Sequence, residues 1–242
     1  MTPLFSIIIP AHNEELRLKS SLQKIHSFIE TQPYEIEVYV VENGSTDRTA
    51  EIAVDFAHTH PAFHLIEVPQ AGKGRAVRHG ILAARGEYRF ICDTDLSMPI
   101  EELVHFLPEE CGPYDIAIAS REVPGSRRFG EPLYRHLIGR AFNLLVRLLA
   151  VPSIHDTQCG FKSFNASVVD ELFNLQMLDG WTFDVEVLFI ALKRGYRVIE
   201  VPINWYYFPG SKIHVLRDSW NMFIDLFRIR RNWRAGNYAP RE

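Results

Sequence analysis

The sequence contains few cysteines and no long apolar run. Cysteine occurs only at Cys92, Cys111 and Cys159 among 242 residues, an odd number at wide spacing. Such a set forms neither a disulfide framework nor a zinc-binding motif, and it is typical of a reducing compartment. No apolar stretch approaches the roughly 18 residues of a transmembrane helix, and residues 1–10 lack the features of a secretory signal peptide. These absences predict a cytoplasmic protein.

Two common nucleotide-binding motifs and an excess of positive charge are also absent. The first predicted strand, residues 4–9, is followed by Pro10-Ala11-His12-Asn13-Glu14, without the G-x-G-x-x-G of a dinucleotide-binding turn. Gly72-Lys73-Gly74 lacks the G-x-x-x-x-G-K-[ST] spacing of a phosphate-binding P-loop. We therefore exclude NAD binding and P-loop chemistry. The formal net charge of -4 argues against general nucleic-acid binding.

The sequence does contain alternating strand and helix patterns. Its hydrophobic content of 47% and charged content of 23% are those of an ordinary globular protein. Apolar runs predict strands over residues 4–9, 37–41, 64–68, 88–92, 115–120 and 198–202. Helical periodicity predicts helices over residues 16–29, 48–58, 75–84, 101–106, 132–149, 187–194 and 219–234. This alternation indicates βαβ units and a mostly parallel sheet. Residues 122–130, rich in Pro, Gly, Ser and Arg, are expected to form a mobile loop.

Polar residues follow the predicted strands of the N-terminal part. Because the carboxyl ends of parallel strands meet at one edge of a sheet, ligands bind there in open α/β folds. Residues 1–100 are therefore predicted to form a nucleotide-binding half. The polar residues expected at this edge are Asn13, Glu14, Glu42, Asn43, Lys73, Asp93 and Asp95.

The most informative short motif is Asp93-Thr94-Asp95, which directly follows the apolar run 88–92. Two residues apart on an extended chain, the carboxylates point the same way and repel each other. A divalent cation that carries a diphosphate compensates this charge, because hard cations prefer carboxylate and phosphate oxygens. A solvated turn is the alternative, but the position at the end of a buried strand favours the metal site.

Two predicted helices and one acidic pair each admit two interpretations. The helices over 132–149 and 219–234 combine apolar residues with several arginines. Each is either a helix packed on the domain, with arginines reaching solvent, or a helix on the surface of an anionic membrane. Asp184 and Glu186, just before the helix over 187–194, either complement its dipole or belong to a functional motif.

Several segments together resemble the family-2 glycosyltransferases, namely residues 6–14, 41–47, 72–74 and 93–95. Within that family, residues 119–121, 156–162 and 181–186 are similar to the dolichyl-phosphate (polyprenyl-phosphate) β-glucosyltransferases. The resemblance covers almost the whole chain. It implies a GT-A-type α/β fold for nucleotide-sugar binding, with a mostly parallel sheet and amphipathic helices toward a membrane.

The resemblance also implies roles at the donor site. By the family pattern, the residues that bind the donor are Pro10, Ala11, Asn13, Glu14, Glu42, Asn43, Lys73, Asp93, Thr94 and Arg121. Asp95 would hold Mg²⁺ or Mn²⁺, with Ser97 as a second ligand in a position where the family often has glutamine.

At the acceptor, the resemblance implies that Arg121, Arg135 and Lys212 engage phosphates and that Asp156 belongs to the acceptor loop. The implied catalytic residues are Asp93, Asp95, Arg135 and Asp156. The expected reaction moves glucose from UDP-glucose to a polyprenyl (dolichyl-type) phosphate with inversion of the anomeric carbon.

Two other functions remain open at this point. One is mannosyl transfer from GDP-mannose to the same lipid, and the other is a non-catalytic protein that binds nucleotide sugars at a membrane surface. The expected organisation is a GT-A domain over residues 1–215, with halves 1–100 and 101–215 for donor and acceptor. Residues 216–242 would form a basic amphipathic tail, and the protein would lie on the cytoplasmic face of a membrane.

Overall fold

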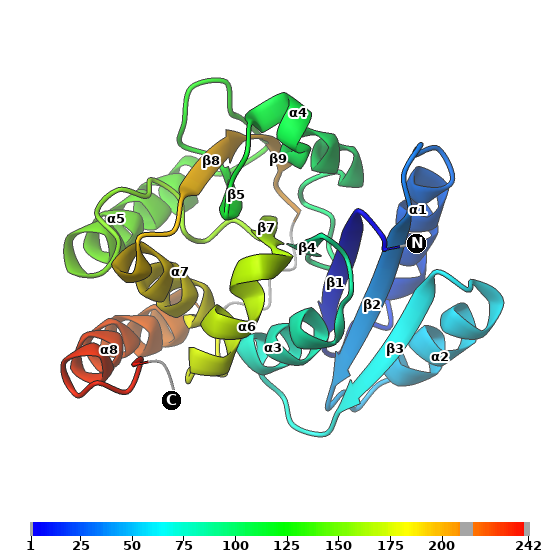
Figure 1. The fold of residues 1–242 in the computed structure, drawn as a ribbon, viewed down its shortest axis with the longest axis horizontal. Coiled ribbons are helices and arrows are strands. Elements are labelled where there is room, and N and C mark those ends of the chain that lie inside the picture. Colours follow the sequence, from blue (N-terminus) through cyan, green and yellow to red (C-terminus); the bar gives the residue numbers. More distant parts are fainter. Residues whose placement is uncertain (1, 209–214, 240–242) are drawn as a thin grey trace.

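The computed structural model describes residues 2–208 and 215–239 and has a seven-stranded sheet at its centre (Figure 1). The strands lie in the order β3-β2-β1-β4-β7-β5-β8. Their bounds are β1 (Phe5–Ala11), β2 (Ile36–Asn43), β3 (Phe63–Val68), β4 (Tyr88–Ile91), β5 (Ile116–Ser120), β7 (Lys162–Asn165) and β8 (Val198–Pro202). All neighbours pair in parallel except β7, which is antiparallel to both β4 and β5. The prediction of an α/β fold with a mostly parallel sheet is confirmed.

Helices cover both faces of this sheet. They are α1 (Leu18–Ile29), α2 (Thr49–Thr59), α3 (Lys73–Ala83), the 3₁₀ helix η1 (Ile100–Phe106), α4 (Pro108–Cys111), α5 (Leu133–Leu149), α6 (Ala166–Leu175), α7 (Phe183–Arg194) and α8 (Val215–Arg234). Helices α1, α2 and η1 pack on one face, and α3, α6 and α7 pack on the other. Helices α5 and α8 contact each other at the left of Figure 1. In the described ranges, no helix is both long and apolar enough to span a bilayer.

Alternate residues of the central strands enter two separate cores. Ile7 and Ile9 of β1 pack in the core with α1 and α2, whereas Ile8 packs in the core with α3. Val40 and Val41 of β2 divide in the same way. Because both faces of the sheet are covered, these strands are apolar at nearly every position, as is typical of buried parallel strands.

Two local predictions are wrong. Pro10 does not end the first strand, since β1 continues to Ala11 and pairs with β2 over its whole length. The ladder with β4 ends at Ile8, so the amide that Pro10 lacks is not needed there. In the segment 122–130, predicted as a loop, strand β6 (Arg127–Phe129) pairs in parallel with β9 (Asn204–Tyr206).

The sequence patterns do not predict β7 or α6. Strand β7 reads Lys-Ser-Phe-Asn, and its Lys162 and Ser163 are buried although they are polar. The strands on both sides stabilise β7, because β4 and β5 each form a hydrogen-bonded ladder with it. Tertiary pairing therefore overrides the weak strand propensity of this segment.

Helix α7 begins four residues before the position predicted from periodicity. Its first turn consequently contains Asp184 and Glu186, and both carboxylates are buried. Their position suits the helix dipole, but burial shows that they also have specific partners inside the protein.

Close packing of α3 on the sheet requires a glycine at position 80. A Cβ atom on Gly80 would lie 2.6 Å from Cγ2 of Ile8 and 2.7 Å from Cγ2 of Val41. We predict that Gly80→Ala lowers the free energy of unfolding by about 1–3 kcal/mol through overpacking, measured by urea denaturation. The control is Gly139→Ala in α5, where a Cβ meets nothing within 4 Å. An equal loss in both variants would contradict the packing argument.

Candidate active site

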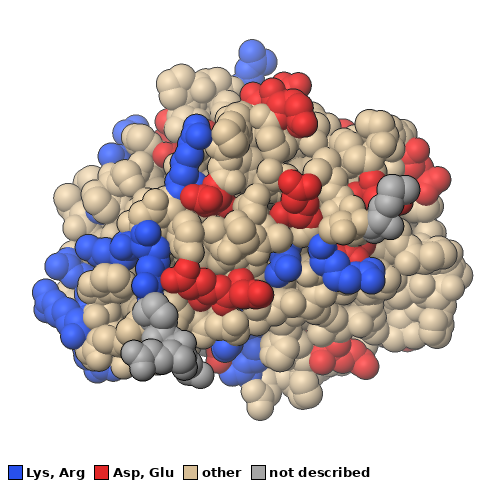
Figure 2. Space-filling view, in the orientation of Figure 1, with Lys and Arg blue, Asp and Glu red and all other residues tan. Residues whose placement is uncertain are grey.

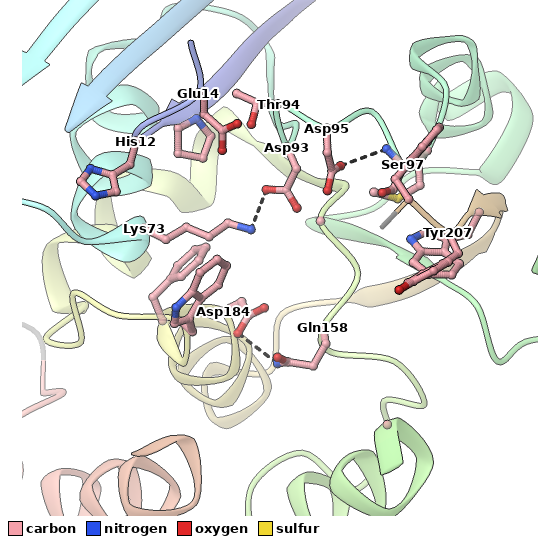
Figure 3. A pocket seen from close by; sticks show the side chains of 18 of the residues that line it. His12, Glu14, Lys73, Asp93, Thr94, Asp95, Ser97, Gln158, Asp184 and Tyr207 are labelled. Atoms are coloured by element: carbon pink, nitrogen blue, oxygen red, sulfur yellow. Dashed lines mark hydrogen bonds and ion pairs between the residues drawn. The ribbon is translucent and has the colours of Figure 1, made fainter. Parts of the chain in front are cut away.

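A cavity of about 930 Å³ opens where the carboxyl ends of β1, β2 and β4 meet (Figure 3). Both the N-terminal and the C-terminal part of the chain contribute to its wall. The predicted residues that line it are Pro10, Glu14, Asn43, Lys73, Asp93, Thr94, Asp95, Ser97 and Arg121. His12, Arg17, Gln158, Trp181, Asp184, Trp205 and Tyr207 line it as well. The expected grouping of polar residues at one edge of the sheet is therefore present.

An ion pair between Lys73 and Asp93 lies at the floor of the cavity. The Nζ atom of Lys73 is 2.6 Å from Oδ1 of Asp93 and 5.2 Å from the centre of the Trp181 ring. Burial alone would raise the pKa of Asp93, but the Lys73 ammonium outweighs this and lowers it. Burial likewise opposes the charge of Lys73, yet Asp93 keeps the lysine pKa above its usual value. Both groups are therefore charged at neutral pH.

Asp95 lies beside this pair and is suited to a divalent cation. Its Oδ1 accepts a hydrogen bond from the Ser97 amide at 3.0 Å, which fixes the carboxylate (Figure 3). Burial, and then the negative charge of Asp93, raise the pKa of Asp95, so a cation here would relieve an electrostatic cost. No group of three or more His, Cys, Asp or Glu side chains suited to a metal occurs in the described part of the chain. The residues fit Mg²⁺ or Mn²⁺ bound through one or two carboxylates and a substrate phosphate.

Gly160 allows the segment 156–162 to approach Asp93. A Cβ atom at this position would lie 2.2 Å from Oδ2 of Asp93 and 3.3 Å from Cε of Met98. A side chain here would therefore displace the carboxylate. The glycine of the segment 156–162 thus has a steric role at the floor of the cavity.

The loops after β1 and β2 hold each other in place. With its amide group turned so that oxygen and nitrogen each face a complementary partner, the Asn43 side chain donates to the Ala11 carbonyl at 2.7 Å and accepts from the Gly72 amide at 3.0 Å. Asn13 accepts from the Thr46 amide at 2.8 Å, and Glu42 accepts from the Ser45 amide at 2.5 Å.

Three of the predicted donor residues, Ala11, Asn13 and Glu42, do not line the cavity itself. Their contacts shape the loops around it. Glu14 does line it and is paired with Arg17, whose Nη2 is 2.9 Å from Oε1 of the carboxylate.

Asp156 lies behind Arg121. The Asp156 carboxylate is 0% exposed and accepts from the Arg121 side chain at 2.7 and 3.0 Å. Burial opposes its ionisation, but the Arg121 guanidinium overcomes this and lowers the pKa of Asp156 to about 2. The guanidinium also lies 5.4 Å from the Trp205 ring centre. Of the pair, Arg121 faces the cavity and Asp156 holds it.

Two predicted phosphate-binding residues have no described side chain. Arg135 belongs to the first turn of α5, but only its backbone is described. Lys212 lies outside the described residues. Their roles stay predictions.

Asp184 is a cavity residue for which the sequence left open a role at the helix dipole or in a functional motif. It pairs with the buried Lys162, whose Nζ is 3.2 Å from Oδ2, and Gln158 donates to its Oδ1 at 3.4 Å. The sequence signal for a functional role of Asp184 was the resemblance of the segment 181–186 to the family. The position of Asp184 in the first turn of α7, facing the cavity, could not be read from the sequence.

Comparison with known proteins identifies the family. Residues 6–173 match the sequence model of Glycosyl transferase family 2. The chain belongs to that family. Among its curated relatives, the dolichyl-phosphate β-glucosyltransferase of Drosophila melanogaster is 36% identical over 241 residues, covering 93% of this chain and 73% of the relative. The Saccharomyces cerevisiae enzyme of the same name is 33% identical over 253 residues, covering 96% and 76%.

Solved structures support the fold of this family-2 glycosyltransferase. Glucosyl-3-phosphoglycerate synthase from Mycobacterium tuberculosis, solved with UDP, superposes with a TM-score of 0.68 over 99% of this chain and 82% of that one. The same enzyme has been solved with Mn²⁺ and UDP-glucose, with a TM-score of 0.64 over 94% of this chain and 78% of that one. At 17% identity in both cases, this likeness establishes a shared GT-A-type fold.

The buried Arg121–Asp156 pair should govern part of the acid stability of the protein. Because the pKa of Asp156 is lowered to about 2, its stabilisation is full above about pH 4 and is lost as the pH falls through about 2. We predict that Asp156→Asn lowers the free energy of unfolding at pH 7 by about 3 kcal/mol, since it leaves Arg121 uncompensated. The loss should shrink toward pH 2 in urea denaturation.

The control is Glu51→Gln, which removes the exposed ion pair with Arg48. No measurable change is expected there. A loss at Asp156 that is independent of pH would contradict the role of its charge.

Proposed function

We propose that this glycosyltransferase moves glucose from UDP-glucose to a polyprenyl phosphate, with inversion, to give a β-linked glucosyl phosphate lipid. The observation that carries the proposal is one cavity that combines the Asp93, Asp95 and Lys73 charges with an apolar wall from α5. The names of the relatives, dolichyl-phosphate β-glucosyltransferases, support the same reaction.

On the donor side, residues 1–100 would bind the nucleotide and its diphosphate. Lys73 carries a fixed positive charge, and its ion pair with Asp93 keeps that charge oriented in the cavity. Asp95 and Ser97 would hold Mg²⁺ or Mn²⁺, which supplies Lewis-acid stabilisation of the leaving diphosphate. The Mn²⁺ and UDP-glucose complex of the mycobacterial enzyme supports this assignment by analogy of fold.

On the acceptor side, Arg121 would bind the lipid phosphate, with Arg135 and Lys212 as further candidates. A phosphate monoester has a second pKa near about 6, so it is largely ionised at neutral pH. The acceptor therefore needs orientation more than a general base. Asp156 serves this orientation by holding the Arg121 guanidinium with two hydrogen bonds.

The apolar wall of the cavity continues onto an exposed surface of α5. Tyr134 and Ile138 line the cavity and are exposed. Along the same helix Leu137, Leu144 and Leu148 are also exposed, Leu148 to 71%. A lipid chain that leaves the cavity along this face would remain against apolar side chains.

Helix α8 has two apolar faces. Met222, Leu226 and Ile229 are buried against the domain, whereas Trp220 and Phe227 are exposed, Trp220 to 63%. One apolar face of α8 therefore packs on the domain, and the second apolar face remains exposed. Figure 2 shows Lys and Arg side chains gathered at the left, where Figure 1 draws α8. Exposed apolar residues beside arginines suit an anionic membrane surface, and we propose that α5 and α8 lie on its cytoplasmic face.

The decisive experiment measures transfer from labelled UDP-glucose, with GDP-mannose in parallel, to a short polyprenyl phosphate in detergent with Mg²⁺ or Mn²⁺. We predict lipid product from UDP-glucose. Asp95→Asn should lower the turnover number at least about 100-fold, because it weakens charge stabilisation of the leaving group. Asp55→Asn, at an exposed position of α2, is the control and should retain full activity.

The other outcomes separate the alternatives. Product from GDP-mannose alone would keep the lipid acceptor and change the donor. UDP binding without product from either donor would favour a non-catalytic binding protein. Unchanged turnover of Asp95→Asn at saturating metal would contradict the assignment of Asp95.

Membrane association gives a separate prediction. Replacing Leu137, Leu144 and Leu148 together by Ser should reduce binding to vesicles of phosphatidylcholine and phosphatidylserine at least about tenfold, because each Leu loses apolar burial worth about 1.5–3 kcal/mol. Cosedimentation measures the bound fraction. Leu16→Ser is the control, because Leu16 is 96% exposed but lies just before α1 and belongs to neither α5 nor α8. Equal losses in both variants would refute a specific membrane face.

A further inference from the structure

Glu186 is a buried carboxylate that does not line the cavity. It is 0% exposed in the first turn of α7. Its Oε2 accepts from the Met177 amide at 3.0 Å and the Leu178 amide at 2.8 Å, and its Oε1 accepts from the Tyr238 hydroxyl at 2.6 Å. A buried carboxylate is costly unless hydrogen bonds compensate it. These three donors therefore tie two distant segments to one side chain.

The first of these segments, residues 176–181, is here named the pocket loop. It packs directly on the turn that carries Lys73. The Gln176 side chain donates to the Gly74 carbonyl at 2.9 Å, and the Arg75 amide donates to the Asp179 carbonyl at 3.3 Å. The side chains of Arg75 and Asp179 also pair at 2.5 Å.

This contact explains the glycines on both sides of Lys73. A Cβ atom on Gly72 would lie 2.7 Å from the Asp179 carbonyl oxygen, and one on Gly74 would lie 2.7 Å from that of Leu178. The backbone of the pocket loop therefore occupies the space that side chains would need. The loop and the lysine turn are therefore in close backbone contact.

The pocket loop ends in the cavity. Gly180 and Trp181 line it, and the Trp181 ring lies 5.2 Å from Nζ of Lys73. The same Nζ is 2.6 Å from Asp93. The position of the loop thus determines the surroundings of the Lys73–Asp93 pair.

The second segment is the end of the described chain after α8. Tyr238 is buried, and its carbonyl accepts from the Arg194 side chain at 2.6 Å. Asp225 of α8 accepts from the Thr182 hydroxyl at 2.8 Å, just before α7. Through Thr182 and Glu186, helix α8 and its continuation are therefore fixed to the start of α7. Arg194 holds Tyr238 at the other end of the same helix.

We propose that Glu186 is a positioning residue through which the C-terminal segment fixes the pocket loop and Lys73 for donor binding. A contiguous chain of contacts runs from Tyr238 through Glu186 to the Met177 and Leu178 amides, and onward to the lysine turn. The inference deepens the proposed function, and it rests on that function only for the identity of the donor.

The test uses Tyr238→Phe as its primary variant, because this change removes only one hydroxyl. Glu186→Gln and the double variant complete a cycle. We expect each single variant to raise the KM for UDP-glucose about fivefold. Each variant loses a hydrogen bond to a charged group, and only part of the free energy lost affects donor binding. The turnover number should stay within about twofold, and the double variant should be no worse than Glu186→Gln.

A second readout does not depend on the donor. Amide hydrogen exchange in residues 176–181 should be faster in Tyr238→Phe than in the parent chain. If UDP-glucose is not the donor, the proposed function fails while exchange in the pocket loop still decides the inference.

The matched control is the hydrogen bond between Tyr196 and Glu171, which lies beyond the other end of α7. Tyr196→Phe should leave the KM and the pocket-loop exchange unchanged. Glu171 is kept intact, because it also pairs with Arg194 at 3.2 Å, and Arg194 contacts the Tyr238 carbonyl. A fall in melting temperature of Tyr238→Phe with unchanged KM and unchanged loop exchange would overturn the proposal. Equal effects in Tyr196→Phe would do the same.

Discussion

The ion pair between Lys73 and Asp93 is the constraint on which the rest of the site depends. Two opposite charges held 2.6 Å apart at the floor of a cavity require fixed surroundings. The end of β4 supplies the aspartate and the start of α3 supplies the lysine. Gly160 leaves room for the carboxylate, and Trp181 covers the ammonium. Segments far apart in sequence thus converge on a single pair of charges.

Positive charges in this protein are held by carboxylates that lie behind them or beside them. Asp156 holds Arg121 from behind, and Glu14 pairs with Arg17 from beside it. Such pairs orient a cation without neutralising its exposed side, which suits the binding of phosphates. The cavity can therefore offer several fixed positive groups although the whole chain has a formal net charge of -4.

The sequence was sufficient to predict the parallel part of the fold and the polar edge of the sheet. Local apolar runs determine strands such as β1 and β2, and the residues that follow them reach the same edge because the strands are parallel. Asp93, Asp95 and Lys73 could be expected together for that reason. Strand β7, the early start of α7 and the position of Asp156 behind Arg121 could not, because each depends on partners 20 or more residues away. The need for glycine on both sides of Lys73 could not be predicted either, because the backbone that requires these glycines lies about one hundred residues later in the chain.

The antiparallel strand β7 has a consequence for the order of folding. Strands β3, β2, β1 and β4 come from the first 91 residues and can assemble among themselves during synthesis. Strand β5 pairs with β7 and β8 but has no ladder with β4, so it cannot extend the sheet when it emerges. The edge of β4 therefore stays open until residues 162–165 arrive, and an open edge can pair wrongly with another chain. The nascent protein is expected to be most prone to aggregation in this interval.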